Sequence, residues 1–279
     1  MLDNQIIYIT GLPRSGSTLL CQLLAHHPDI YCPGYSSPLC QTLTGLRYSL
    51  SDNDFLLAQM DPDFDRTYQQ LCNAFRGFIN GWFAENDRGW VVDKNRGWLQ
   101  HLELVNYLDP DFKMVVCIRE LGQIYGSIEA QHQKTLLLDF PDRLANLSRY
   151  GRAESLFGSS GVVGAPLRSI ESLQDIDSQL QQHLFYIIFE DLLGEPQRVM
   201  QTFLQWLGLP SIAWDFQNLT VRPHESDSYY RFKYPHQTYS ALREPQQHLI
   251  PTRIQAELQR QFSWFYQIFY PGLLESNES

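Results

Sequence analysis

The chain has 279 residues, of which 43% are hydrophobic and 19% charged, and this is enough for one large α/β domain with its own core. Its net charge of −10 argues against nucleic acid or an anionic membrane as a partner, so an anionic ligand would need a local basic site. The five cysteines are odd in number and lack CxxC spacing, which argues against a disulfide scaffold or a zinc knuckle.

The N-terminal segment 1–11 indicates where the chain works. It has no basic region, and its apolar run is too short for a signal peptide. No part of the sequence approaches the roughly 18 apolar residues of a membrane span. Because the cysteines also suit a reducing compartment, we expect a cytoplasmic protein, and we interpret residues 6–10 as a buried first strand.

Apolar runs alternate with amphipathic segments along the chain. The runs predict strands at 6–10, 90–93, 112–118 and 184–189. Helical periodicity predicts helices at 18–25, 66–84, 97–108, 121–133, 169–182, 195–207 and 252–269. Glycines and prolines predict loop-rich structure at 31–64, a flexible loop or lid at 158–166 and irregular structure at 210–250. This alternation predicts the α/β class, with a central parallel sheet flanked by helices and ligands bound at the carboxyl ends of its strands.

The turn Gly11–Thr18, with the sequence GLPRSGST, lies between the first strand and the first helix. Its GxxxxG spacing, followed by hydroxyl residues, is typical of a loop that holds a phosphate through backbone N–H groups and a helix N-terminus. A nucleoside-triphosphate loop has Lys at the position of Ser17, whereas the cation here is Arg14. That placement suits a 5′-phosphate that carries one more anionic group, with less need for a metal. The alternative is an ordinary glycine turn.

The segments Ile9–Leu20 and Leu24–Asp29 make this region resemble the 5′-phosphosulfate-binding loop and first helix of the sulfotransferase superfamily. The likeness is closest to the bacterial and tyrosylprotein-sulfotransferase-like branch, which has Arg where cytosolic small-molecule enzymes have Lys. The resemblance implies 3′-phosphoadenosine 5′-phosphosulfate (PAPS) as sulfuryl donor, adenosine 3′,5′-bisphosphate (PAP) as product, a hydroxyl acceptor and no metal. The residues that it assigns to the 5′-phosphosulfate are Pro13, Arg14, Ser15, Gly16, Ser17 and Thr18.

The resemblance also sets the expected domain organisation. We find no composition break, so residues 1–279 are predicted to form a single P-loop-type domain. Its nucleotide-binding core is expected at about 5–208, where the likeness to the family lies. The C-terminal segment 209–279 matches the family only weakly.

A second likeness lies at the end of the strand 112–118. Arg119 follows this strand directly, and Ser127 comes eight residues later. The pair is similar to the family's 3′-phosphate site, where an Arg fork and a Ser clasp the phosphate. Alone, the two would be a surface Arg and a helix Ser. Glu190 and Asp191 likewise resemble an acidic segment near the family's nucleotide, or else they cap the following helix.

The end of the strand 90–93 carries the expected catalytic cation. Lys94 stands where the family has a catalytic Lys. Together with Arg14, it would stabilise the negative charge that develops on the leaving 5′-phosphate. An alternative makes Asp93 a metal ligand of the Walker-B kind.

The family's general base is not matched in this chain. Arg96 takes the place of the His of cytosolic members, and residues 31–38 contain no carboxylate where the tyrosylprotein branch has Glu. His224 and His236 are therefore the predicted bases, although each is also explained as a solvated loop residue.

The acceptor and two rival functions stay open. The family's later glycine-rich, lysine-ending segment is missing, and Arg231 and Lys233 are the residues that would replace it. A group of aromatic residues either lines an acceptor pocket or packs: Tyr35, Tyr48, Trp82, Trp98, Tyr229 and Tyr230. The rivals are a P-loop kinase or nucleotidase, and a module that binds PAP without transferring a sulfuryl group. Neither the acceptor nor the oligomeric state follows from the sequence.

Overall fold

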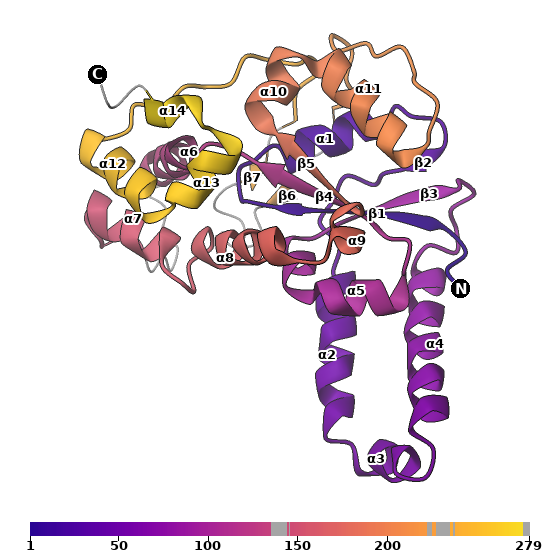
Figure 1. Ribbon diagram of the computed structural model, residues 1–279. Coiled ribbons are helices and arrows are strands. Elements are labelled where there is room, and N and C mark those ends of the chain that lie inside the picture. Colours follow the sequence, from indigo (N-terminus) through magenta and orange to yellow (C-terminus); the bar gives the residue numbers. More distant parts are fainter. Residues whose placement is uncertain (135–143, 145, 222–224, 227–234, 237, 276–279) are drawn as a thin grey trace.

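The computed structural model describes residues 1–134, 144, 146–221, 225–226, 235–236 and 238–275 (Figure 1). Its centre is a sheet of five parallel strands in the order β2-β3-β1-β4-β5. The strands are β1 (Gln5–Gly11), β2 (Ile30–Tyr31), β3 (Trp90–Lys94), β4 (Lys113–Ile118) and β5 (Leu184–Ile188). The predicted α/β class with a central parallel sheet is confirmed, and all four predicted strands are present. The short edge strand β2 lies in a stretch that was predicted to be loop.

Both faces of the sheet are apolar, because each is covered by helices. Alternate residues of β1 point to opposite sides: Ile6 and Tyr8 join one buried cluster, whereas Ile7 and Ile9 join the other. One face is covered by α1 (Ser17–Leu24) and α11 (Pro196–Leu207), and the other by α4 (Phe64–Trp82), α5 (Leu102–Leu108) and α8 (Gly164–Ser172). The late helices α12 (Thr252–Gln261) and α13 (Ser263–Phe269) pack into this second cluster, so they share the core of the sheet.

The prediction of loop-rich structure at 31–64 is wrong for most of that range. Two helices, α2 (Leu39–Ser51) and α3 (Asp54–Met60), lead into α4, and α2–α4 project away from the sheet (Figure 1). Side chains cap the starts of α3 and α4: Asn53 accepts a hydrogen bond from the Leu56 N–H, and Asp63 accepts one from the Arg66 N–H. Gly45, one of the glycines behind the loop prediction, lies inside α2. Helical hydrogen bonding overrides its weak helix propensity there.

The loop predicted at 158–166 is shorter in the structure, because α8 begins at Gly164. Residues 158–163 form a tight turn between α7 (Arg149–Phe157) and α8, with Val163 fully buried. A Cβ on Gly161 would lie 2.2 Å from the Leu156 carbonyl oxygen, so the glycine permits close backbone packing rather than movement.

Several predicted helices are interrupted in the structure. The segment 97–108 starts as the 3₁₀ helix η1 before α5, and the segment 169–182 divides among α8, the 3₁₀ helix η2 and α9. The predicted last helix breaks at Phe262 between α12 and α13. The remaining bounds are η1 (Arg96–His101), α6 (Leu121–Lys134), η2 (Leu173–Asp175), α9 (Ser178–Gln181), α10 (Phe189–Gly194), β6 (Glu225–Ser226), β7 (Pro235–His236) and α14 (Gly272–Glu275). No helix in these described parts of the chain combines the length and apolar character needed to cross a bilayer.

The register of the sheet brings four strand ends together. Ile9 of β1 pairs with Lys94 of β3, and Gly11 pairs with Cys117 of β4. Because the strands are parallel, the segments that follow β1, β3, β4 and β5 emerge at the same edge of the sheet. That edge is where the candidate site lies.

Candidate functional site

The loop after β1 is held tightly against β4 and α10. Gly11 has φ 119°, and a Cβ there would lie 2.2 Å from the Cys117 carbonyl oxygen. Gly16 has φ 88°, and its Cβ would meet the Phe189 ring at 2.4 Å. Only glycine combines these left-handed conformations with such close approaches. The glycine spacing recognised in the sequence is therefore required by the path of the backbone.

The loop leads into a helix start that has no internal partner for its N–H groups. Gly16 is the N-cap of α1 and supplies no side-chain cap, so the first N–H groups of the helix remain available to an anion. The Ser15 hydroxyl donates to the Leu12 carbonyl oxygen at 2.5 Å, so Ser15 would contact a ligand through its backbone. Pro13 is buried and lines neither of the two cavities described next. Pro13 therefore contributes to the shape of the loop.

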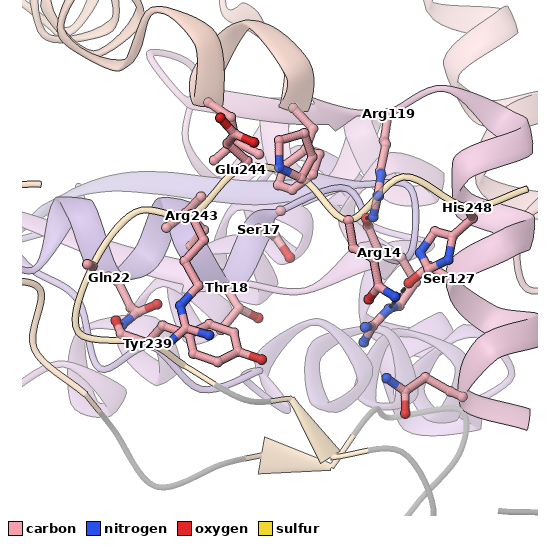
Figure 2. Close-up of a pocket in the computed structure, with 18 of the residues that line it drawn as sticks. Arg14, Ser17, Thr18, Gln22, Arg119, Ser127, Tyr239, Arg243, Glu244 and His248 are labelled. Atoms are coloured by element: carbon pink, nitrogen blue, oxygen red, sulfur yellow. Dashed lines mark hydrogen bonds between the residues drawn. The ribbon is translucent and has the colours of Figure 1, made fainter. Parts of the chain in front are cut away.

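A cavity of about 420 Å³ opens on one side of this loop (Figure 2). It brings together six residues predicted for the nucleotide: Arg14, Gly16, Ser17, Thr18, Arg119 and Ser127. Lys134 and Arg243 add two further cations to its wall. A cavity with this surplus of positive side chains suits a ligand that carries several negative charges.

Arg14, Ser127 and Arg119 form one connected cluster in this cavity. The Arg14 Nε donates to the Ser127 Oγ at 3.1 Å, and an Arg119 Nη donates to the Arg14 carbonyl oxygen at 3.0 Å. The Arg119 guanidinium lies over the Phe189 ring at 4.6 Å, and its Nε is a buried donor with no hydrogen-bond acceptor among the described residues. Burial lowers the pKa of Arg119, an effect that Glu190 opposes. A buried donor of this kind is a group that an anion would satisfy.

Glu190 lies close to this cluster without lining either cavity. Its carboxylate accepts a hydrogen bond from the Tyr270 hydroxyl at 2.7 Å, which joins α10 to the C-terminal end of α13. Glu190 and Asp191 fall in the first turn of α10, and the residue before them, Phe189, forms part of the cavity wall.

A second cavity of about 760 Å³ lies on the other side of the loop. Lys94 and Arg96 are its cations, and Ser17 and Thr18 line both cavities. Lys94 is only 7% exposed, and its Nζ donates to the Gly34 carbonyl oxygen at 2.9 Å. Its ammonium group is therefore held in the wall of the second cavity, beside the segment that contains Gly34.

The wall of the second cavity is organised around Asn95. Its Nδ2 donates to the Ser37 carbonyl oxygen and to the Gln41 Oε1, each at 2.6 Å, and its Oδ1 accepts from the Gly97 N–H at 2.8 Å. These bonds fix residues 34–38 and the start of α2 beside the end of β3. Among the described residues, the lining contains hydroxyl and amide groups but no carboxylate or imidazole.

Asp93 is sealed beneath this wall. The carboxyl group is fully buried and accepts a hydrogen bond from the Trp98 indole at 2.6 Å. Burial raises the pKa of Asp93 to about 6, although Ser37 and Trp98 partly oppose this effect. Because Asp93 lines neither cavity, its position does not favour the alternative of a metal ligand. Trp98 is 1% exposed and packs on Tyr8, so its alternative role in a pocket is wrong.

Four residues that sequence reasoning missed close the first cavity. They are Gln22, Tyr239, Arg243 and His248, and all but Gln22 come from the segment 238–250. The Gln22 Nε2 donates to the carbonyl oxygens of Thr220 and Tyr239, and the Arg243 guanidinium stacks on the Tyr239 ring at 3.9 Å. A polar Gln within the apolar face of the first helix was the one available signal for this closure.

The remaining candidates do not line either cavity or cannot be placed. Tyr35, Tyr48 and Trp82 are exposed and line neither one. His236 belongs to β7, but its side chain is outside the described part of the structure. His224, Tyr229, Tyr230, Arg231 and Lys233 also lie outside the described residues.

Comparison with known proteins gives a consistent result. The pattern of the sulfotransferase family matches residues 6–215. The sulfotransferase domain of the curacin biosynthetic pathway is 18% identical, with a TM-score of 0.54 over 94% of this chain and 99% of that domain. A sulfotransferase from Alicyclobacillus acidocaldarius is 14% identical, with a TM-score of 0.53 over 96% of this chain and 93% of that one. A mouse sulfotransferase complexed with PAP is 10% identical, with a TM-score of 0.52 over 99% and 90%. No curated protein sequence matches significantly.

Proposed function

The chain belongs to the sulfotransferase family, and we propose that its two cavities hold the two substrates of one transfer reaction. The enzyme transfers a sulfuryl group from PAPS to an acceptor and releases PAP. The observation that carries the proposal is that Ser17 and Thr18 line both cavities. A sulfuryl group bound at this part of the loop would face both the nucleotide and the acceptor.

The first cavity is the proposed donor site. The loop 13–18 and the N-terminus of α1 would hold the 5′-phosphosulfate through backbone N–H groups. Arg119 and Ser127 would bind the 3′-phosphate, for which the unsatisfied Nε of Arg119 is a ready donor. This assignment explains why a strand-end arginine is buried and oriented by a carbonyl group and an aromatic ring.

The second cavity is the proposed acceptor site, and its chemistry is that of an in-line displacement. The acceptor oxygen forms a bond to sulfur while the bond between sulfur and the 5′-phosphate oxygen breaks. Lys94 and Arg14 would stabilise the negative charge that the leaving phosphate gains, and the two cavities would supply the orientation. The hydroxyl proton must pass to a base, for which His224 and His236 remain our predictions.

The acceptor that fits best is a hydroxyl compound with polar groups near the reacting oxygen. The second cavity offers a hydroxyl group from Ser36 and an amide from Gln41. These side chains bind by hydrogen bonds and carry no charge, so they do not demand a charged acceptor. The five buried cysteine thiols favour the cytoplasm as the place of the reaction.

Calorimetric titration with PAP in the absence of Mg²⁺, with ADP and ATP as controls, tests the donor site. We expect PAP to bind and to be preferred strongly over ADP, because only PAP has the 3′-phosphate. Binding of ATP with Mg²⁺ but not of PAP would favour the kinase alternative. Tight PAP binding without transfer to a broad panel of hydroxyl acceptors would favour the binding module.

A further inference from the structure

His248 is held against α6 by contacts on both sides of its backbone. Its N–H donates to the Gln123 Oε1 at 2.9 Å, and the Gln123 Nε2 donates to the His248 carbonyl oxygen at 3.1 Å. A Cβ on Gly126 would lie 2.4 Å from the His248 Cβ, so the helix has room for this histidine only because residue 126 is glycine. The position of His248 is therefore fixed by the fold and does not depend on its ring.

The imidazole of His248 points toward the Arg14–Ser127 pair (Figure 2). His248 lines the same cavity as Arg14, Arg119 and Lys134, and these three cations act on its charge. They come from the phosphate loop, the end of β4 and α6. From its own segment, Arg243 and Glu244 also line this cavity.

This environment disfavours the imidazolium form. Burial lowers the pKa of His248, and Arg119, Arg14 and Lys134 lower it further. A phosphate dianion between the ring and the two arginines would offset these positive charges and would accept a hydrogen bond from the ring. Both effects favour the protonated ring, so the pKa of His248 rises when such an anion binds.

We propose that His248 is a specificity-determining residue for the 3′-phosphate, which it binds as an imidazolium after taking up a proton. The inference rests on the proposed donor site and adds a residue from a segment where the likeness to the family is weak. It makes recognition of the 3′-phosphate depend on pH. The affinity for the 3′-phosphate increases as pH falls toward the pKa of His248 in the free enzyme, because binding is then coupled to the uptake of a proton by His248.

Calorimetry on the full-length enzyme can measure this proton. PAP is titrated at pH 6.5, 7.5 and 8.5, in pairs of buffers with different ionisation enthalpies, into the wild type, His248→Gln and Gln247→Ala. Gln247 is the exposed neighbour of His248 and lines neither cavity, so its variant controls for a change in this segment. ADP, which lacks the 3′-phosphate, is the control ligand.

We expect the wild type to take up protons with PAP near pH 7.5 and to bind PAP about 3- to 10-fold more tightly at pH 6.5 than at pH 8.5, which corresponds to a rise of about one to two units in the pKa of His248 on binding. His248→Gln should lose both the proton uptake and most of the pH dependence, with ADP binding unchanged. Gln247→Ala should behave as the wild type. The phosphate's own ionisation is common to all three proteins, so it cancels in the comparison.

Two results would overturn the inference while leaving the donor site intact. One is PAP binding with the same proton uptake in His248→Gln as in the wild type. The other is an equal loss of PAP and ADP affinity in this variant, which would show that the side chain shapes the cavity without reading the 3′-phosphate. If PAP fails to bind the wild type at every pH, the proposed donor site itself is wrong.

Discussion

The two cavities share Ser17 and Thr18 but are built in different ways. The donor cavity contains four cations, and its central cluster is formed by side chains that come directly from strand ends and the helices after them. The acceptor cavity has Lys94 and Arg96, and the rest of its polar wall consists of hydroxyl and amide groups held in place by Asn95. If the two cavities hold the donor and the acceptor as proposed, charge would select the donor, whereas shape and neutral hydrogen bonds would select the acceptor.

The difference has a consequence for how each side tolerates change. A fixed set of cations binds one anionic cofactor, and loss of any member leaves a phosphate group without its partner. A wall of neutral groups can be altered with small effects, because each hydrogen bond contributes only about 1 kcal/mol. We expect substitutions to separate the two cavities by the size and kind of their effects.

The largest effect is expected at Lys94, in the wall of the acceptor cavity. Lys94→Ala should reduce turnover by about 10² to 10³, because it removes a cation from the charge that develops in the transition state. PAP affinity should change by less than about threefold, since the ground-state phosphates rest on the loop and the arginines. Release of PAP from PAPS, together with PAP calorimetry, measures both quantities. Unchanged turnover with a large loss of PAP affinity would place Lys94 on the donor side alone.

Arg119→Ala tests the donor cavity from within. We expect PAP to bind about 10- to 100-fold more weakly, because a charge-assisted hydrogen-bonding partner of the 3′-phosphate is removed. ADP binding should change little, so the preference for PAP over ADP should fall by the same factor. Arg119→Lys is the matched variant and should recover part of that preference, since it restores charge but not the two-pronged geometry. An equal loss for both ligands would contradict the assignment.

Asp93→Asn tests the buried support of the acceptor cavity. The folded protein holds the pKa of Asp93 at about 6, above its usual value of 3.8, which corresponds to about 3 kcal/mol. The folded state therefore binds the proton of the Asp93 carboxyl group more tightly than the unfolded state. The contribution of this bound proton to the free energy of unfolding is lost as pH rises from about 4 to 6. Denaturant unfolding should show Asp93→Asn to be more stable than the wild type at pH 8, with the difference shrinking toward pH 4. The exposed Asp87→Asn is the control, and a pH-independent difference would contradict the prediction.

The smallest effect is expected at Gln41, on the rim of the acceptor cavity. Its side chain exchanges hydrogen bonds with Asn95, at 2.6 and 3.3 Å. Gln41→Ala should raise the acceptor KM about fivefold by loosening that wall, and it should leave PAP affinity unchanged. Steady-state kinetics with the acceptor varied measures the change. A loss of PAP affinity would show that the two cavities are less separate than their geometry indicates.

Much of the donor side could be predicted from short stretches of the chain. An apolar run followed by GLPRSGST specifies a buried strand, a tight turn and a helix start, because glycine and backbone geometry act over a few neighbouring residues. Arg119, Ser127 and Lys94 were identified by their resemblance to the family's sites. The parallel sheet explains why they lie near the phosphate loop, because its strand ends meet at one edge.

The closure of the donor cavity and the lining of the acceptor cavity depend on long-range contacts that local sequence patterns do not reveal. Gln22 and Tyr239 are separated by 217 positions and meet through one hydrogen bond, and no local pattern encodes such a contact. His248 enters the site because a glycine on α6 leaves space for it. Residues 39–60 were misjudged because glycine and proline signals are local, whereas helix caps and packing determined the outcome. Short-range backbone preferences are thus readable along the chain, but contacts across it depend on the packing of the whole fold.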